Sequence, residues 1–396
     1  MTVIDTTQRP GGPAAPVTRR IPVIDSDVHQ NLGIADEVLL RHLSPRWREY
    51  LNMIGLRRIA TERGIPPQRE FTHRLDAIDP SGRPTVIPGF TRKQLLDEYD
   101  MTAVVLSNGA AINLPRGGGN FPEQLAIDLA TAFNDAHREV WLKADPRFYA
   151  SIHLPIEHPE AAVREIERVK SGEMGDRYPS IVLEMRTEYG IGSPKYWPVF
   201  EACQHYDLAV TFHTSPGRRM TPSGGINYYY EWHCGLAQRN YPVTSSFIYE
   251  GVFEQFPKLR VVLVEQCWSW APAFAWRMDK AWNMLRAEVP HLKRAPSEYF
   301  RDHFWFTTQP MEEPESLEEF PELLDQFESV FGPDKLMFSS DYPHWDFDSP
   351  YESVPESLPE AQRRRILGEN GSKFYRIPLK ANSGILAPAG AGEAAA

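Results

Sequence analysis

Short apolar stretches alternate along this chain with longer segments in which apolar residues recur every three or four positions. Eight short stretches are rich in strand-forming residues, and they occupy positions 22–29, 102–108, 148–155, 180–185, 208–214, 259–266, 304–309 and 335–344. Several are continuously apolar, which is typical of strands that helices cover on both faces. Segments with helical spacing separate most of them, at positions 121–144, 158–171, 193–207, 244–256 and 358–375.

This alternation predicts an α/β fold, and eight strands that alternate with helices predict a (β/α)8 TIM barrel. A doubly wound open sheet is the second possibility, but no glycine-rich phosphate-binding loop follows the first strand. Two connections are too long for barrel turns: residues 30–98 follow strand one and residues 215–243 follow strand five. Insertions of that length are uncommon unless they are functional. We therefore expect them to cap the C-terminal mouth of the barrel, where barrel enzymes carry their active sites.

Both ends of the chain lack the large apolar side chains that a core requires. Residues 1–20 are rich in Pro, Gly and Thr, and residues 377–396 include the small-residue run NSGILAPAGAGEAAA. Such segments bury too little apolar area to offset the entropy of ordering them. We expect a disordered N-terminal segment, one elaborated barrel over residues 21–376, and a flexible C-terminal tail.

The charge balance of the 396 residues narrows the range of partners. Lys and Arg number 42 against 53 Asp and Glu, which gives a formal net charge of −11. An acidic chain is not expected to bind nucleic acid or an anionic membrane surface. The cysteines at 203, 234 and 267 are an odd, widely spaced set, which favours a reducing compartment over a disulfide framework. Because no apolar run approaches ~18 residues and no apolar leader precedes the barrel, we expect a cytoplasmic protein.

Candidate metal ligands stand at the ends of three predicted strands. In VIDSDVH, strand alternation puts Asp25, Asp27 and His29 on one face, with Asp27 and His29 at the tip of strand one. His213 ends strand five, and Asp341 follows the apolar part of strand eight. Two imidazoles and two carboxylates suit Zn²⁺, Fe²⁺ or Mn²⁺ better than a thiolate-loving ion.

The order of these motifs, Asp-x-His on strand one, His on strand five and SSDYPH on strand eight, resembles the amidohydrolase superfamily. The similarity is closer to the amidohydrolase-related branch that includes aminocarboxymuconate-semialdehyde decarboxylase, and it runs over roughly residues 20–376. The phrases GVFEQFPKLRVVLVE, PSEYF and SSDYPHWDFD also carry it.

This resemblance implies one divalent metal ion in the barrel mouth, with zinc as the first choice and iron or manganese as alternatives. On the matching positions it implies Asp27, His29 and His213 as ligands. It implies Asp341 as a further ligand or as the general base that takes a proton from a metal-activated water.

Two positions depart from the decarboxylase pattern of this branch. Those enzymes usually carry His-x-His on strand one, where this chain has Asp27 in the first position. They also carry a histidine after strand six, where this chain has VEQCWSW with Glu265. Since that histidine would protonate or orient the substrate, its absence favours hydrolysis, although Glu265 could serve as a catalytic acid in either chemistry.

Other side chains near strand ends are candidates for catalysis or binding, and each has a structural alternative. His233, on the insertion after strand five, is either a catalytic residue or an exposed loop histidine. Candidates for substrate binding, or alternatively for core packing or surface ion pairs, are His153, Arg186, His344 and Trp268. The aromatic residues of the same loops would suit a flat ring, although most such residues serve packing: Tyr228, Tyr229, Tyr230, Trp232, Trp270 and Trp345.

The remaining candidates receive a structural interpretation. We expect Cys267 to be a buried, inert thiol. We expect the other histidines to be solvated or structural, and these are His42, His73, His137, His158, His205, His291 and His303.

These expectations combine into a metal-dependent hydrolase that uses an activated water on a small cyclic or aromatic substrate, with an amide, imide, lactone or C–C bond as the target. The first alternative is a metal-dependent, non-oxidative decarboxylase of an aromatic or unsaturated acid. The second is a barrel that binds a small ligand without catalysis. Related barrels commonly pair, so a homodimer is possible.

Overall fold

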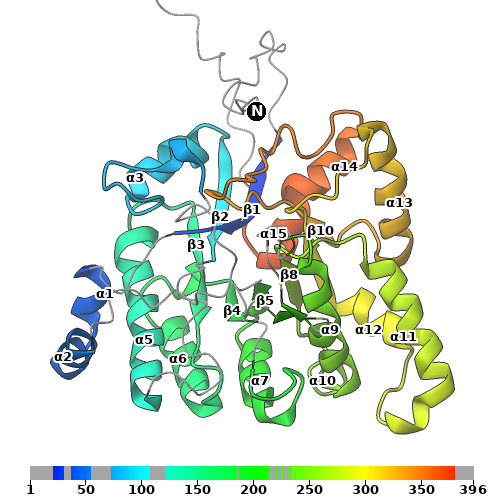
Figure 1. Ribbon diagram of the computed structural model, residues 1–396, viewed down its shortest axis with the longest axis horizontal. Helices are drawn as coiled ribbons and strands as arrows, with labels where there is room; N and C mark the ends of the chain where they lie inside the picture. Colours follow the sequence, from blue (N-terminus) through cyan, green and yellow to red (C-terminus); the bar gives the residue numbers. More distant parts are fainter. Residues whose placement is uncertain are drawn as a thin grey trace, which may run out of the picture.

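A closed barrel of parallel strands forms the centre of the protein, as seen in a computed structural model (Figure 1). The structure describes residues 21–30, 37–54, 73–107, 122–184, 187–213, 220–221, 224–225, 228, 231 and 233–379. The strands are β1 (Val23–Val28), β2 (Met101–Leu106), β3 (Phe148–His153), β4 (Ser180–Glu184), β5 (Ala209–His213), β8 (Val261–Val264), β9 (Phe304–Thr307) and β10 (Leu336–Met337).

The order of these strands around the sheet is β1-β2-β3-β4-β5-β8-β9-β10. Backbone hydrogen bonds join the last strand segment to the first: Ser26 N donates to Phe338 O over 3.0 Å, and His29 N donates to Tyr342 O over 2.7 Å. The eight predicted strands and the (β/α)8 TIM barrel are confirmed.

Helices surround the barrel, and each predicted helical segment is helical in the structure. They include α5 (Glu123–Ala136), α6 (Pro159–Ser171), α7 (Trp197–His205), α9 (Asn240–Tyr249), α10 (Val252–Gln255), α14 (Glu360–Arg364) and α15 (Asn370–Tyr375). Three further helices, which were not predicted, lie over residues 271–331: α11 (Ala271–Leu285), α12 (Pro296–His303) and α13 (Phe320–Phe331). On α11 the large apolar side chains of Trp276, Met284 and Leu285 are exposed, so its amphipathic pattern is blurred.

Only some of the described residues of the first long insertion lie over the mouth of the barrel. Its helices α1 (Glu37–His42) and α2 (Pro45–Met53) lie outside the barrel beside α5 (Figure 1). There, Trp47 Nε1 donates to Asp128 Oδ2 over 2.6 Å, and His42 Nε2 lies 2.9 Å from Glu139 Oε2. These contacts hold the pair of helices against α5, so the expectation of a mouth cap is wrong for this stretch.

Later in the same insertion the chain returns to the mouth. The backbone of His73 pairs with that of His344, and Arg74 N donates to Pro343 O over 2.9 Å. The chain then passes through α3 (Pro88–Thr91) and a wide helical turn (Arg92–Asp97) into β2. In the second insertion the described residues include a short antiparallel pair, β6 (Met220–Thr221) and β7 (Gly224–Gly225).

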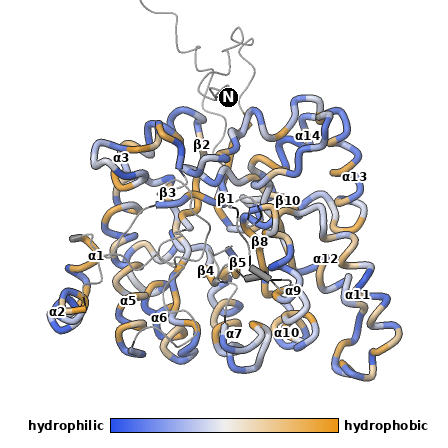
Figure 2. The backbone as a smooth tube through the Cα atoms, viewed as in Figure 1, coloured by the Kyte–Doolittle hydropathy of each residue, from blue (hydrophilic) through white to orange (hydrophobic). Residues whose placement is uncertain are grey.

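Apolar side chains pack on both sides of the barrel wall. Those on its outer side join the helices in one large core, and the helices alternate between hydrophobic and hydrophilic segments along the tube (Figure 2). Inside the barrel a second, smaller core forms, and α15 contributes to it (Figure 1). Its members are Ile24, Ala103, Val105, Ala209, Val262, Val264, Met337, Phe374, Tyr375 and Ile377.

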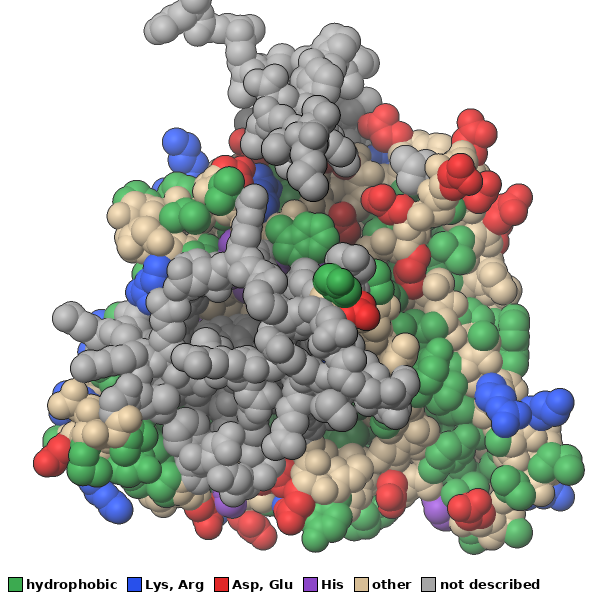
Figure 3. Space-filling model, in the orientation of Figure 1, with side chains coloured by type: hydrophobic (Ala, Val, Ile, Leu, Met, Phe, Trp, Pro, Cys, Tyr) green, Lys and Arg blue, Asp and Glu red, His purple; other side chains and the backbone are tan. Residues whose placement is uncertain are grey.

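Charged side chains are spread over the outer surface. Acidic groups gather at the upper right of the face in Figure 3, where Figure 1 places α13 and α14. Within the described residues, the helices are all too short or too polar to cross a membrane.

The packing between α12 and α13 predicts a strong effect of truncating Phe300. This side chain is fully buried, with its ring 4.9 Å from that of Phe331 and 5.0 Å from that of Phe304. Phe300→Ala is expected to lower the free energy of unfolding by about 3–5 kcal/mol, because it leaves a cavity. Trp276→Ala, which removes an exposed ring from α11, is the control and should change it by less than about 0.5 kcal/mol. Urea denaturation measures both, and equal losses would contradict this packing.

The buried amine of Lys335 predicts a pH-dependent stability. Burial lowers the pKa of Lys335 from 10.5 to about 8, against the opposing effect of Asp334 and Asp302. The amine lies 3.3 Å from the ring centroid of Trp305. Below the lowered pKa the folded protein buries a charge that the unfolded chain solvates, whereas above pH 10.5 the amine is neutral in both states.

The free energy of unfolding of the wild type, minus that of Lys335→Met, should therefore increase as pH rises from about 8 to about 10.5. Denaturation of both proteins across this range measures the difference, in which titrations common to both cancel. A difference that does not change with pH would contradict the buried, charged amine.

Candidate metal centre

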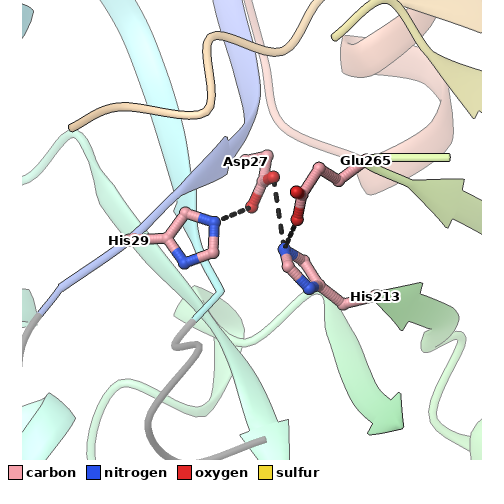
Figure 4. Close-up of side chains that lie close together, drawn as sticks. All are labelled: Asp27, His29, His213 and Glu265. Atoms are coloured by element: carbon pink, nitrogen blue, oxygen red, sulfur yellow. Dashed lines mark ion pairs between the residues drawn. The ribbon is translucent and has the colours of Figure 1, made fainter. Parts of the chain in front are cut away.

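Three of the four predicted ligands meet at the carboxyl ends of their strands. Asp27 and His29 come from β1 and its end, and His213 is the last residue of β5. Asp27 Oδ1 lies 3.5 Å from His29 Nε2, and Asp27 Oδ2 lies 3.3 Å from His213 Nε2 (Figure 4). The carboxylate thus lies between two imidazoles that come from opposite sides of the barrel.

Two more carboxyl groups reach the same place through unusual backbone. Glu265 follows β8 with φ of 56°, and Asp341 follows β10 with φ of 54°. The left-handed region is uncommon for residues other than glycine, and such conformations concentrate at functional sites. Glu265 Oε2 lies 3.5 Å from His213 Nε2, and Asp341 Oδ1 lies 2.8 Å from His29 Nε2.

These positions define two overlapping groups of possible ligand atoms. One atom from each of Asp27, His29, His213 and Glu265 lies within 4.8 Å of the others, and the same holds for His29, Asp341 and His344. Glu265, expected as a catalytic acid, therefore also has the position of a ligand. We call Asp27, His29, His213, Glu265 and Asp341 the mouth cluster.

The mouth cluster fits a divalent cation by charge and by its unused atoms. All five residues are at most 6% exposed. Asp27 Oδ2, His29 Nε2 and Asp341 Oδ1 form ion-pair contacts within the cluster but make no well-aligned hydrogen bond within the described residues. Three carboxyl groups that share such a site are strongly disfavoured as anions without a counter-charge. Nitrogen and oxygen donors of this kind suit Zn²⁺, Fe²⁺ or Mn²⁺.

Neighbouring groups hold the carboxylates of the cluster in place. The Ser107 hydroxyl, at the end of β2, donates to Asp27 Oδ1. Asp25, expected on the face of Asp27, instead binds the segment after β10, where its carboxylate accepts bonds from Ser340 N over 3.0 Å and Ser340 Oγ over 2.5 Å. His344 Nδ1 lies 2.7 Å from Asp341 Oδ2.

Burial and like charges set the pKa of each carboxyl group in the metal-free cluster. Burial alone would raise the pKa of Asp27, but His213 and His29 outweigh it and hold that pKa well below its usual range. Burial raises the pKa of Asp341 to about 7, against the opposing effect of His344. Burial, together with Asp341 and Asp27, raises the pKa of Glu265 well above its usual value. A bound cation would favour the ionised form of the carboxyl groups that ligate it.

A row of three histidine rings in contact extends from the cluster toward the first insertion. The ring centroids of His29 and His344 are 4.3 Å apart, and those of His344 and His73 are 5.2 Å apart. Burial, with His344 and His29 beside it, lowers the pKa of His73 to about 2. His73 was expected to be solvated or structural, and its place in an insertion without a strand pattern gave no signal for this position.

His233 does not join the mouth cluster. Its Nε2 lies 3.0 Å from Asp346 Oδ2, and its ring lies 5.5 Å from that of Trp345. Asp346 also accepts a bond from Gln309 Nε2 over 2.8 Å. His233 therefore connects the second insertion with the loop after β10.

Two other candidates face away from the cluster. Trp268 is fully buried against Phe320 and Phe327 of α13, so it packs in the outer core and the prediction of substrate contact is wrong for it. The ring of His153 lies 5.0 Å from that of His137, at the end of α5.

The remaining predicted pocket residues do not belong to the mouth cluster as the structure describes it. Four of them lie outside the described residues: Arg186, Tyr229, Tyr230 and Trp232. Tyr228 and Trp345 are more than half exposed, and Trp270 packs against Phe274 and Phe300. Cys267, expected to be buried, is partly exposed. Partial burial still raises the pKa of its thiol, and all three cysteines are free.

Comparison with known proteins gives matches over most of the chain. A sequence profile of the family described as Amidohydrolase matches residues 92–377. The gamma-resorcylate decarboxylase of Polaromonas sp. is 26% identical over 297 residues, which cover 72% of this chain and 86% of that protein. The 2-amino-3-carboxymuconate-6-semialdehyde decarboxylase of Dictyostelium discoideum is 26% identical over 261 residues, which cover 64% of this chain and 68% of that protein.

A solved structure with the same fold is the dihydroxybenzoic acid decarboxylase of Polaromonas sp., which contains bound manganese and the inhibitor 2-nitroresorcinol. Its TM-score is 0.60 at 20% identity, over 90% of this chain and 97% of that one. At this identity the likeness supports the fold.

The geometry of the cluster predicts that His213 is needed for metal binding. His213→Ala should weaken the binding of Mn²⁺ or Zn²⁺ by more than about 100-fold, since even partners outside a coordination sphere contribute 10–100-fold. The control is His303→Ala, which removes a buried histidine that stacks on Phe253, away from the cluster. Competition with a chelator measures both affinities, and an unchanged affinity in His213→Ala would exclude this residue as a ligand.

Proposed function

The chain belongs to the amidohydrolase family, and from this membership we propose that it is a metal-dependent, non-oxidative decarboxylase of a hydroxylated aromatic acid. The observation that carries the proposal is the buried mouth cluster, whose charge and unused donor atoms call for a cation. The relatives support the reaction type, since those named above are decarboxylases of resorcylate and of a carboxymuconate semialdehyde. They favour decarboxylation over the hydrolysis that the sequence alone suggested.

We assign Asp27, His29 and His213 as metal ligands, and Glu265 lies where a fourth ligand would complete the set. A divalent ion in this position supplies Lewis-acid polarisation and an anchor for anionic oxygens of the substrate. Manganese is the first choice because the related dihydroxybenzoic acid decarboxylase contains it, while zinc and iron fit the same donors.

Decarboxylation requires that a proton replaces the departing carboxylate. The bond between ring carbon and carboxylate breaks, its electron pair stays on the ring carbon, and carbon dioxide leaves. We assign Asp341 as the group that donates the proton to that carbon. His344 Nδ1 lies 2.7 Å from Asp341 Oδ2, and the side chain of His344 is 21% exposed. His344 can therefore pass a proton from solvent to Asp341 after each turnover.

Glu265 takes the place of the histidine that decarboxylases of this branch carry after strand six. Its side chain is 5% exposed, and its Oε2 lies 3.5 Å from His213 Nε2. A carboxylic acid can orient a substrate oxygen by donating a hydrogen bond, as a histidine does. We therefore propose Glu265 as the group that orients the substrate, unless it ligates the metal itself.

Hydrolysis is the second candidate function, and the same replacement favours it. A carboxylate in the mouth can hold and deprotonate a water, which a protonated histidine cannot. The products separate the two reactions, because hydrolysis incorporates solvent ¹⁸O and releases no carbon dioxide. A barrel that binds a ligand without catalysis, and a homodimeric state, remain predictions.

The proposed role of Asp341 predicts the behaviour of one conservative variant. With 2,6-dihydroxybenzoate and Mn²⁺, the wild type is expected to release carbon dioxide and form resorcinol. Asp341→Asn should retain the metal and lower kcat by about 10²–10⁴-fold, because the side chain can no longer donate the proton. Product analysis by chromatography, with metal content determined on the same sample, measures this.

Asp325→Asn, an exposed change on α13, is the control and should keep wild-type turnover. Full activity of Asp341→Asn with metal bound would remove Asp341 from the mechanism. Turnover of an ester or amide with ¹⁸O incorporation, and none of hydroxybenzoates, would favour the hydrolase instead.

A further inference from the structure

Three hydroxyl groups lie inside the barrel next to the residues that carry the mouth cluster. Ser26 stands immediately before Asp27 on β1, and Thr211 stands two residues before His213 on β5, so it shares the face of that histidine. The third hydroxyl belongs to Tyr375 at the end of α15, inside the inner core of the barrel. These three side chains are 1%, 1% and 3% exposed.

None of these three oxygens makes a well-aligned hydrogen bond within the described part of the chain. They are nevertheless neighbours: burial and the carboxyl groups of Asp27 and Asp25 raise the pKa of Tyr375, while the Ser26 and Thr211 hydroxyls lower it from within hydrogen-bonding range. Buried hydroxyls are almost always hydrogen-bonded, since leaving one unpaired costs about 1–3 kcal/mol. A shared water molecule can satisfy several such groups at once.

The helix that carries Tyr375 is fixed firmly against the barrel. Asn370 Nδ2 donates to Leu336 O over 2.8 Å, and Phe338 N donates to Ile366 O over 2.9 Å just before the helix. At Gly371 an added Cβ would lie 3.2 Å from Ile24 Cγ2, so the missing side chain lets α15 approach β1 closely. The tyrosine hydroxyl is therefore held in one place inside the barrel.

The strands that this hydroxyl connects are far apart in the sheet. Three strands separate β1 from β5 on either side of the closed barrel, so no backbone hydrogen bond joins them. Asp27 and His213 nonetheless need a fixed separation to share a ligand. A connection through the barrel interior can fix this separation, which the hydrogen bonds of the sheet cannot do directly.

We propose that Tyr375 is a positioning residue of the metal centre. Its hydroxyl and those of Ser26 and Thr211 share a buried water that links β1 to β5 and holds Asp27 and His213 at the spacing the metal requires. This inference rests on the proposed metal centre but on neither proposed reaction.

The test is the affinity of the full chain for Mn²⁺, measured by competition with a chelator after the purified protein is stripped of metal. Tyr375→Phe keeps the ring in the inner core and removes the hydroxyl, and it should weaken Mn²⁺ binding by about tenfold. The matched control is Tyr178→Phe. Tyr178 is 1% exposed, and its hydroxyl donates to Asn134 O over 2.9 Å outside the barrel, so its loss should leave the affinity unchanged.

A second variant tests whether the effect travels through the shared water. In Thr211→Val the valine side chain has nearly the same shape as threonine but lacks the hydroxyl at the β5 end of the connection. This variant should therefore weaken Mn²⁺ binding by a similar factor. In Tyr375→Phe/Thr211→Val the two effects should be clearly less than additive, because either change breaks the same connection. Thr211→Val also tests the proposal if Tyr375→Phe fails to fold, as judged by circular dichroism.

Wild-type affinity in both single variants, or fully additive losses in the double variant, would overturn the proposal while leaving the metal centre intact. An equal loss of Mn²⁺ affinity in Tyr178→Phe would show that the effect is general destabilisation, and this would also overturn the proposal. A wild type that binds no Mn²⁺, Zn²⁺ or Fe²⁺ would overturn the metal centre itself and this inference with it.

Discussion

The burial of three carboxyl groups around two imidazoles is the constraint on which this structure depends. In water each carboxylate would be solvated, but here Asp27, Glu265 and Asp341 are at most 4% exposed. Without a counter-charge, burial and mutual repulsion raise the pKa of Glu265 and Asp341, while the pKa of Asp27 stays low because two histidines flank it. A divalent cation resolves this conflict directly, since it matches both the excess charge and the donor atoms.

The barrel brings these groups together because parallel strands all end at one mouth. The cluster draws on β1, β5, β8 and the segment after β10, and among these β1 and β5 lie on opposite sides of the barrel. The supporting groups come from further elements, with Ser107 after β2 and Tyr375 on the C-terminal helix. The site therefore depends on closure of the barrel and on the C-terminal helix that packs against β1 and β10, so damage far from the mouth can alter the ligand spacing.

Much of this arrangement was predictable from the sequence, because it follows from strand periodicity. The eight apolar stretches located the strands, and residues at their carboxyl ends gave Asp27, His29, His213 and Asp341. Prediction failed where the chain leaves regular structure. The backbone of Glu265 and Cys267 is left-handed. Side chains after β8 therefore no longer alternate between the two faces of the strand, and Trp268 points into the outer core. His73 approaches the site from an insertion whose path no local pattern specifies.

Anomalous diffraction can show whether the mouth cluster binds one divalent metal ion. Crystals of the full chain grown with Mn²⁺ would be measured on both sides of the manganese absorption edge. We predict one strong peak at about 2.0–2.3 Å from Nε2 of His29, Nε2 of His213 and a carboxylate oxygen of Asp27. The absence of a peak in the barrel mouth, or a peak bound by other residues, would contradict the account.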